Sequence, residues 1–307
     1  MERITSRQNP LITRLRRLGA EKKARRAQGV FLCEGVKLVG EALRWGPPPE
    51  LLVVAEGTAP PAELPAGVRL ATAKRGGVTV TRVEIAREGL ARPRGRYVTL
   101  EMPSVSVLDE RDTDVIETGA AELRALLPPE GPVLVLGIGN RRVTADALGP
   151  RTAQKILVTM GPQHTLPVRG IRPVAALAPG VSGDTGLTLR QLAAAMVDAV
   201  RPAALICVDS LCSAEAARLG RTIQFSDTGL HPADARHDRH LDAAALGVPV
   251  IAAGIPTLMD ADEGADLVLT PRALDSVIAH GSALLAGILN RALQPRLSVA
   301  QLCWLTG

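Results

Sequence analysis

The sequence predicts an α/β fold, a three-layer α/β/α sandwich with a mainly parallel sheet, preceded by a small basic α/β fragment. Strand-like apolar runs alternate with segments of helical apolar spacing. Hydrophobic residues make up 46% of the 307 residues but aromatic residues only 2%, so the core has to be packed from Ala, Val, Leu and Ile. Residues 1–50 hold eleven Lys and Arg against five Asp and Glu, a balance of +6 in a chain whose net charge is +5, so the basic character belongs to the N-terminus.

Residues 1–70 are the expected basic fragment. A helix is predicted after an N-cap at Thr5 or Ser6, because Leu11, Leu15 and Leu18 recur at near-helical spacing. The next elements are expected as a strand at 29–35, a helix at 36–45 and a strand at 49–57, before a Pro-, Ala- and Gly-rich linker at 56–67. A basic helix of this kind suits contact with a phosphate backbone, and a solvated charged face is the alternative.

Residues 76–307 form the expected main domain, in which strands alternate with helices. Strands are predicted at 78–85, 95–103, 131–140, 168–180, 202–210 and 247–260, and helices at 112–127, 144–159 with an interruption near Pro150, 188–200 and 273–293. Right-handed crossovers would cover both faces of the sheet. No apolar run reaches the roughly 18–20 residues of a membrane span, and the basic start lacks the apolar core of a signal peptide, so we expect a cytosolic protein without membrane contact.

The four cysteines carry no expected site. Cys33, Cys207, Cys212 and Cys303 lack metal-type spacing, and a chain of this length without an export signal is not expected to form disulfides. We therefore expect them to be buried or incidental thiols.

Two strand ends deliver acidic side chains. Asp146 follows the run "VLVLGIGN", with Thr144 as the expected helix cap, and Asp209 ends "ALICV" directly, 63 residues later. Ligands and catalytic groups gather at the carboxyl ends of parallel strands, so both acids are expected to face one crevice. Two close carboxylates share a proton, so one acts as a base toward water while the other polarises a carbonyl. Alternatively, the pair and a histidine hold a metal that activates water. Both routes lead to hydrolysis.

The loop "GIGNRRVTADALGP" does not fit a nucleotide site. A dinucleotide loop needs a third glycine where Arg142 stands, and the Gly-Lys-Ser/Thr of a P-loop is absent. Asn140 is then expected to bond the loop backbone. A second turn, "APGVSGDTGLTL", either offers backbone N–H groups as an oxyanion cradle or simply connects a strand to a helix. Asn140, Gly183 and Asp184 are the candidate substrate-binding residues, and no cofactor is expected.

The segment "DTGLHPADARHDRHLD" is the candidate metal site. Its potential ligands are His231, His237, His240, Asp227, Asp234, Asp238 and Asp242. Such a cluster can bind a transition metal, and a solvated polar loop is the alternative. His231, which follows "SDTGL" at a strand end, is the histidine expected to reach the crevice.

The N-terminal fragment resembles the substrate-binding domain of SpoU-type RNA ribose methyltransferases. The resemblance rests on the opening "ITSRQNPLI" and the block "FLCEGVKLVGEAL", and covers about the first 55 to 70 residues. Nothing downstream resembles the knotted methyltransferase domain of that family. The resemblance therefore implies weak RNA contact through residues 1–50 and no methyl transfer.

From about residue 76 the chain resembles the germination protease family. The matching blocks are "VTVTRVEI", "GRYVTLEMP", "VLGIGNRRVTADALGP", "VRGIRPVAALAPGVSGDTG", "VDSLCS", "TIQFSDTGLHP" and "GVPVIAAGIPTLMDA". The resemblance implies a phosphorylase/hydrolase-like sandwich, a homotetramer and an aspartic-type endopeptidase of the spore core cytoplasm. It implies that this endopeptidase degrades small acid-soluble spore proteins during germination, with Asp146 and Asp209 as the catalytic pair.

The family is also made as a zymogen, and the chain departs from its pattern in four places. Residues 1–70 stand where the family has its cleavage region, Asp184 replaces a glutamine, Ala214 stands where a basic residue is expected, and "ADARHDRH" replaces a stretch rich in Gly and Ser. The "GIGN" loop also resembles hydrogenase maturation proteases, which makes a metal-dependent protease using Asp146, Asp209 and His231 the second hypothesis. A non-enzymatic RNA-binding fusion is the third.

Overall fold

The computed structural model describes residues 10–21, 23–24, 67–90, 92–109, 111–161, 170–213, 215–231, 240–260 and 268–306. The chain divides into two compact units. The first comprises Met1–Val68 and Gly89–Arg92, and the second comprises Arg69–Glu88 and Pro93–Gly307.

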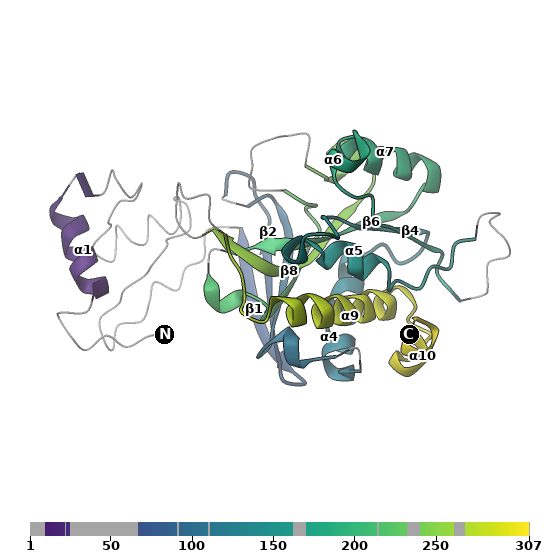
Figure 1. Ribbon diagram of the computed structural model, residues 1–307, viewed down its shortest axis with the longest axis horizontal. Helices are drawn as coiled ribbons and strands as arrows, with labels where there is room; N and C mark the ends of the chain where they lie inside the picture. Colours follow the sequence, from purple (N-terminus) through teal and green to yellow (C-terminus); the bar gives the residue numbers. More distant parts are fainter. Residues whose placement is uncertain are drawn as a thin grey trace. The chain divides into compact units, whose positions relative to one another are not determined.

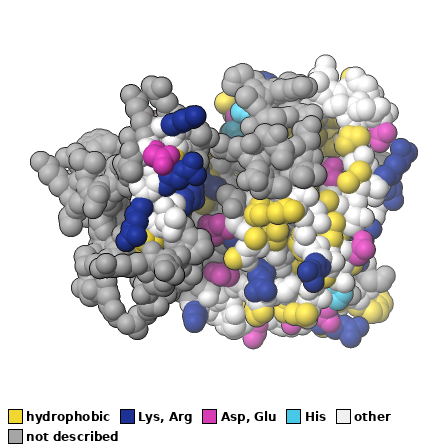
Figure 2. All heavy atoms as spheres, turned by 60° about the vertical axis from the view of Figure 1, so that its left-hand side comes forward, with side chains coloured by type: hydrophobic (Ala, Val, Ile, Leu, Met, Phe, Trp, Pro, Cys, Tyr) yellow, Lys and Arg dark blue, Asp and Glu magenta, His cyan; other side chains and the backbone are white. Residues whose placement is uncertain are grey.

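In the first unit, α1 (Pro10–Ala20) is the predicted basic helix. Leu18 is buried, whereas Arg14, Arg16 and Arg17 are exposed. Lys and Arg side chains gather on the described part of this unit (Figure 2). The N-cap expected at Thr5 or Ser6 lies outside the described residues. So do Cys33 and the elements expected within residues 29–57.

The described part of the second unit contains one sheet of nine strands (Figure 1). The strands run in the order β1-β2-β3-β7-β8-β6-β4-β5, and β9 pairs with β8. Their bounds are β1 Val68–Arg75, β2 Val78–Ile85, β3 Gly95–Glu101, β4 Val133–Gly137, β5 Val174–Leu177, β6 Ala204–Cys212, β7 Thr222–Ser226, β8 Val250–Asp260 and β9 Val268–Leu269.

The sheet is mixed. The pairs β5–β4, β4–β6 and β6–β8 are parallel, whereas β8–β7, β7–β3 and β3–β2 are antiparallel. The predicted α/β class is confirmed, and the parallel half is formed by the continuous apolar runs of the sequence. The antiparallel half was not predicted, because the spacing of apolar residues reports which face is buried and not the direction of the chain.

The parallel strands are buried on both faces, which gives three layers. Along β4, Val133 and Val135 enter one hydrophobic core, whereas Leu134 and Leu136 enter the other. The first core contains residues of α4 (Thr113–Leu126), α5 (Leu148–Ala153) and α9 (Leu274–Leu293), and the second contains residues of α7 (Leu189–Val200) and α8 (Ala243–Leu246). The remaining helical elements are η1 Val105–Val107, η2 Thr144–Asp146, α6 Ser182–Thr185, η3 Ala216–Arg218 and α10 Val299–Thr306.

The helix predicted at 144–159 is shorter than expected. It consists of the 3-10 turn η2 and the six-residue α5. Beyond α5, the side chain of Asn290 on α9 accepts a hydrogen bond from Leu157 N–H at 2.8 Å and donates one to the Lys155 carbonyl at 2.9 Å. The side-chain amide of a residue on another helix thus satisfies backbone groups that a longer helix would have bonded internally.

Helix α9 has the length and apolar composition of a membrane span, yet two thirds of it is buried within the protein. It lies along α4 and α5 beneath the sheet in Figure 1 and supplies a large part of the first core. It is therefore a core helix of this unit.

Two glycines allow α5 to pass directly over the carboxyl ends of β4 and β6. A side chain on Gly137 would overlap the Gly149 carbonyl, and one on Gly149 would overlap the carbonyls of Ile138 and Val208. Backbone packs on backbone at this point without an intervening side chain. This contact fixes the position of the loop that joins β4 to α5.

We expect Gly149→Ala to destabilise the second unit by about 1–3 kcal/mol, because the added methyl group has to displace backbone and not a flexible side chain. Gly183→Ala is the matched control, since a Cβ at Gly183 meets nothing within 4 Å. The measurement is the free energy of unfolding in denaturant. Equal stability of the two variants would contradict the proposed close packing.

Candidate active site

Asp209 lies on β6 directly after five buried residues. By the alternation of the strand, its side chain is on the same face as Leu205 and Cys207, which belong to the second core. The carboxylate accepts a hydrogen bond from the Ser210 N–H at 2.8 Å. On β8 the residue in register is Gly254, where a side chain would overlap the Asp209 carbonyl. The strand end therefore holds Asp209 between backbone groups, partly buried.

Asp146 lies in η2, where the loop returns from β4. The Asn140 N–H donates a hydrogen bond to Asp146 Oδ2 at 2.6 Å, and Gly139, at φ +120°, packs against the Asp146 carbonyl. The Asn140 side chain accepts a hydrogen bond from the Arg142 N–H at 3.0 Å, so it bonds the loop backbone as predicted. The expected cap at Thr144 is wrong: Val143 precedes η2, and Thr144 is its first residue.

The loop is tied to the neighbouring strands. Ile138 N–H donates to the Val208 carbonyl at 2.8 Å, which extends the β4–β6 ladder to the residue before Asp209. The Thr257 hydroxyl group, on β8, donates a hydrogen bond to the Ala145 carbonyl at 3.0 Å. The backbone next to Asp146 is thereby held against β8, and the backbone of its loop against β6.

The two carboxyl groups lie close enough to interact. Burial raises the pKa of Asp209 to about 8, and the negative charge of Asp146 adds to this rise. Burial also raises the pKa of Asp146, while the hydrogen bond from Asn140 lowers it. At neutral pH the Asp209 carboxyl is therefore mainly protonated, a state that favours hydrogen-bond donation.

Two other side chains of β6 are buried near Asp209. The Ser210 hydroxyl oxygen is buried and has no hydrogen-bond partner among the described residues. By the alternation of the strand it lies on the opposite face from Asp209, toward the first core, where an unsatisfied hydroxyl suits a bound water. Cys207 is fully buried, and its burial together with the charge of Asp209 raises the pKa of its thiol. This cysteine is a core residue, and the described Cys207, Cys212 and Cys303 form no disulfide.

The candidate substrate-binding residues border the same loop. Asp184 on α6 lies 3.7 Å from Arg142 in an exposed ion pair, which links α6 to the Asp146 loop. Gly183 is exposed, with open space around its Cα. Sequence reasoning treats Arg142 only as a misfit to a glycine motif and misses this pairing. The doublet Arg141-Arg142 beside Asp146 was the available signal of a charged loop.

The candidate metal residues that the structure describes do not form a metal-binding cluster. His231 is exposed, hydrogen-bonds the Thr228 carbonyl and stacks edge-on with His240 at 5.0 Å between ring centres. Asp227 pairs with Arg96 at 2.6 Å, and Asp242 caps α8. Within the described ranges there is no group of three or more His, Cys, Asp or Glu residues able to hold a metal ion. His237, Asp234 and Asp238 lie outside those ranges.

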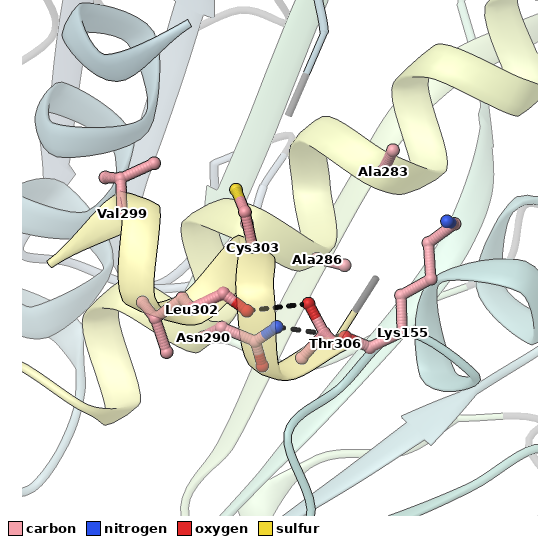
Figure 3. A pocket seen from close by; sticks show the side chains of 9 residues that line it. Lys155, Ala283, Ala286, Asn290, Val299, Leu302, Cys303 and Thr306 are labelled. Carbon is pink, nitrogen blue, oxygen red and sulfur yellow. Dashed lines mark hydrogen bonds between the residues drawn. The ribbon is translucent and has the colours of Figure 1, made fainter. Parts of the chain in front are cut away.

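A cavity of about 50 Å³ lies elsewhere, between α9, α10 and the end of α5 (Figure 3). Its walls are mostly aliphatic, and the Asn290–Lys155 and Thr306–Leu302 hydrogen bonds cross its floor. A space of this size holds a water molecule or two and no peptide. It is a packing gap of the helical layer.

The fold and the paired carboxyl groups define an α/β protein of the class that carries its reactive groups at the carboxyl ends of parallel strands. The family model for the germination protease matches residues 58–263, about two thirds of the sequence. The chain belongs to the germination protease family, and by this membership it is a peptidase.

Individual relatives agree with the family match. The germination protease of Clostridium perfringens strain SM101 is 32% identical over 278 residues, covering 72% of this chain and 86% of the relative. The germination protease of Caldanaerobacter subterraneus subsp. tengcongensis is 40% identical over 214 residues, covering 65% of each.

Two further comparisons concern other proteins. A model of the MRM3-like substrate binding domain matches residues 9–88. Among solved structures, the NiFe hydrogenase maturation protease HycI from Thermococcus kodakarensis KOD1 is similar with a TM-score of 0.37 and 16% identity, covering 56% of this chain and 98% of that one.

The raised pKa of Asp209 predicts a pH dependence of stability. A carboxyl with a pKa of about 8 in the folded state and near 3.8 when unfolded stabilises the fold fully below pH 3.8 and loses this contribution as the pH rises to 8. We expect the free energy of unfolding of the wild type to fall relative to Asp209→Asn between pH 5 and 8, by at most about 1.4 kcal/mol per pH unit. Asp198→Asn, an exposed acid on α7, should retain the wild-type slope. Parallel curves for wild type and Asp209→Asn would contradict the raised pKa.

Proposed function

We propose that this chain is an endopeptidase that degrades small acid-soluble spore proteins during spore germination, with Asp146 and Asp209 as its catalytic pair. The observation that carries the proposal is the electrostatic coupling of two partly buried carboxyl groups within the segment that matches the peptidase family. We propose proton transfer between these carboxyl groups and water, without a cofactor.

The environments of the two acids assign their roles. Asp209, with its pKa of about 8, donates a hydrogen bond to the carbonyl oxygen of the scissile peptide. Asp146, whose ionised form is favoured by the Asn140 N–H, accepts a proton from the attacking water as the new carbon–oxygen bond forms. When the tetrahedral intermediate collapses, Asp146 returns this proton to the departing amine nitrogen as the carbon–nitrogen bond breaks. A pair of acids with separated pKa values is suited to this exchange.

The remaining assignments follow from the family. We infer that Asn140, Gly183 and Asp184 contact the substrate, because they border the Asp146 loop and α6 is linked to that loop by the Asp184–Arg142 pair.

We further propose a cytoplasmic protein of the spore core that assembles as a homotetramer and is made as a zymogen. In this proposal the two domains are residues 1–70 and 76–307, and the segment removed on activation lies within the N-terminal part.

We expect Asp146→Asn and Asp209→Asn each to lower kcat for a purified small acid-soluble spore protein by at least about 100-fold, because each removes a proton-transferring group. Asp198→Asn is the control, since this exposed acid on α7 lies outside the site. Cleavage is followed by mass spectrometry of substrate and enzyme, with and without a chelator. Full activity of either site variant would refute the pair. Activity abolished by chelation and restored by zinc or nickel would favour the metal-dependent alternative with His231.

A second function, weak RNA binding by residues 1–50, is supported by the match to the MRM3-like substrate binding domain and by the exposed arginines of α1. An arginine that pairs with an RNA phosphate releases counterions, so the logarithm of the affinity falls linearly with the logarithm of the salt concentration.

We expect the double variant Arg16→Ala/Arg17→Ala to reduce this salt slope by about 1.4 for single-stranded RNA, at about 0.7 for each phosphate that is no longer neutralised. Arg272→Ala, an exposed arginine of the second unit, should leave the slope unchanged. Fluorescence anisotropy of the full chain over a range of about 50–200 mM salt measures both. Binding that does not depend on salt would exclude this function.

A further inference from the structure

The strand β5 forms one edge of the sheet. It pairs with β4 on one side, and no strand of the described residues pairs with its other side. An open edge presents backbone N–H and C=O groups that can pair with another extended chain. In this protein the edge is one strand away from β4, whose end begins the Asp146 loop.

The backbone groups of β5 alternate in direction. Val133 of β4 donates its N–H to the Pro173 carbonyl at 2.9 Å, so the groups of Pro173, Ala175 and Leu177 face β4, and those of Val174 and Ala176 face outward. Val174 is satisfied locally, because Thr159 Oγ1 accepts its N–H at 2.9 Å and its carbonyl accepts from the N–H groups of Thr159 and Met160.

Ala176 is different. Within the part of the chain that the structure describes, its outward N–H and C=O form no hydrogen bond. Val174 is already paired, and β5 ends at Leu177. The usable edge is therefore only a few residues long. That length is too short for pairing between whole sheets and sufficient for a short extended peptide.

The surroundings of this edge suit a peptide that continues toward the two carboxyl groups. After β5 the chain passes to α6, which the Asp184–Arg142 pair links to the Asp146 loop. Large apolar side chains are exposed on these same segments: Leu177 is 39%, Leu187 44% and Val143 50% exposed. Apolar contacts beside a free edge are the features by which strand addition selects side chains.

We propose that the extended substrate chain binds as a short added strand on the outer edge of β5, paired with the N–H and C=O of Ala176. The proposal rests on the peptidase function and specifies how its substrate is held. Strands lie about 4.8 Å apart and a strand rises about 3.3 Å per residue. A chain paired with β5 lies about three strand spacings, about 14 Å, from β6, which carries Asp209, so it reaches the two carboxyl groups within about four or five residues. The cleaved bond therefore lies that far from the paired residue.

Ala176→Pro tests the proposal directly. Proline removes the outward N–H and leaves the β4–β5 hydrogen bonds in place, and Ala175 already has the extended conformation that a following proline requires. Ala176→Val is the matched control, because it retains the N–H and the strand conformation. The substrates are a peptide with six residues on each side of the cleaved bond and a peptide with two on each side.

We expect Ala176→Pro to raise KM for the long peptide about tenfold with kcat unchanged, and to leave cleavage of the short peptide unaffected. Ala176→Val should behave like the wild type toward both. Equal KM values for Ala176→Pro and Ala176→Val on the long peptide would overturn the proposal. Should Ala176→Pro fail to fold, N-methylation of the long peptide one residue at a time, measured on the wild type, replaces it. A rise in KM is then expected only for a residue four or five positions from the cleaved bond, and its absence would overturn the proposal.

A binding measurement separates this inference from the proposed function. The dissociation constant of the long peptide is measured by fluorescence for each protein, independently of cleavage. Weaker binding by Ala176→Pro, together with a wild type that cleaves nothing, would retain the edge as a peptide site and refute the peptidase assignment. Cleavage by the wild type with equal binding to all variants would retain the peptidase and refute the edge.

Discussion

The site depends on one contact, the passage of α5 over the ends of β4 and β6 with only backbone between them. Gly137 and Gly149 make this approach possible, since a side chain on either would overlap a carbonyl of the other segment or of the neighbouring strand. The contact turns the chain back within a few residues of leaving β4. As a result, the Asp146 carboxylate accepts a hydrogen bond from the Asn140 N–H and lies close to Asp209 on β6. The glycines therefore serve to position a carboxylate, and the phosphate-loop interpretation of the same residues does not apply.

The two acids differ because burial and charge act on them unequally. Both are partly buried, which disfavours the charged form of each, and each accepts one backbone N–H hydrogen bond, Asp209 from Ser210 and Asp146 from Asn140. Burial raises the pKa of Asp209 to about 8, and the charge of Asp146 adds to this rise, whereas burial alone raises the pKa of Asp146. A similar pair of residues thereby acquires unlike proton affinities without a third ionisable group. In the proposed mechanism this difference separates the group that accepts a proton from the group that donates one.

Much of the parallel half of the sheet could be predicted from the sequence, because strands buried on both faces are continuous apolar runs, as in β4 and the first half of β6. The same reasoning predicted Asp146 and Asp209 as neighbours at strand ends. The antiparallel half was not predicted, because the spacing of apolar residues in β2 and β3 does not indicate which strand each one pairs with. The sequence also did not predict where α5 ends, because the backbone beyond it bonds to Asn290, which lies 133 residues from Leu157 in the sequence. The Arg142–Asp184 pair likewise joins segments that are separate in sequence.

The placement of β1 and β2 limits where the protein can be divided. The matches to the MRM3-like substrate binding domain and to the peptidase family both include residues 58–88, and from Arg69 onward these residues belong to the sheet of the second unit. A cut at the end of the MRM3-like match, after residue 88, would remove β1 and β2 from the sheet of the second unit and leave β3 as its edge strand. Any proteolytic cut between the two units that leaves this sheet intact therefore falls upstream of Arg69. The two family matches thus overlap within a single sheet.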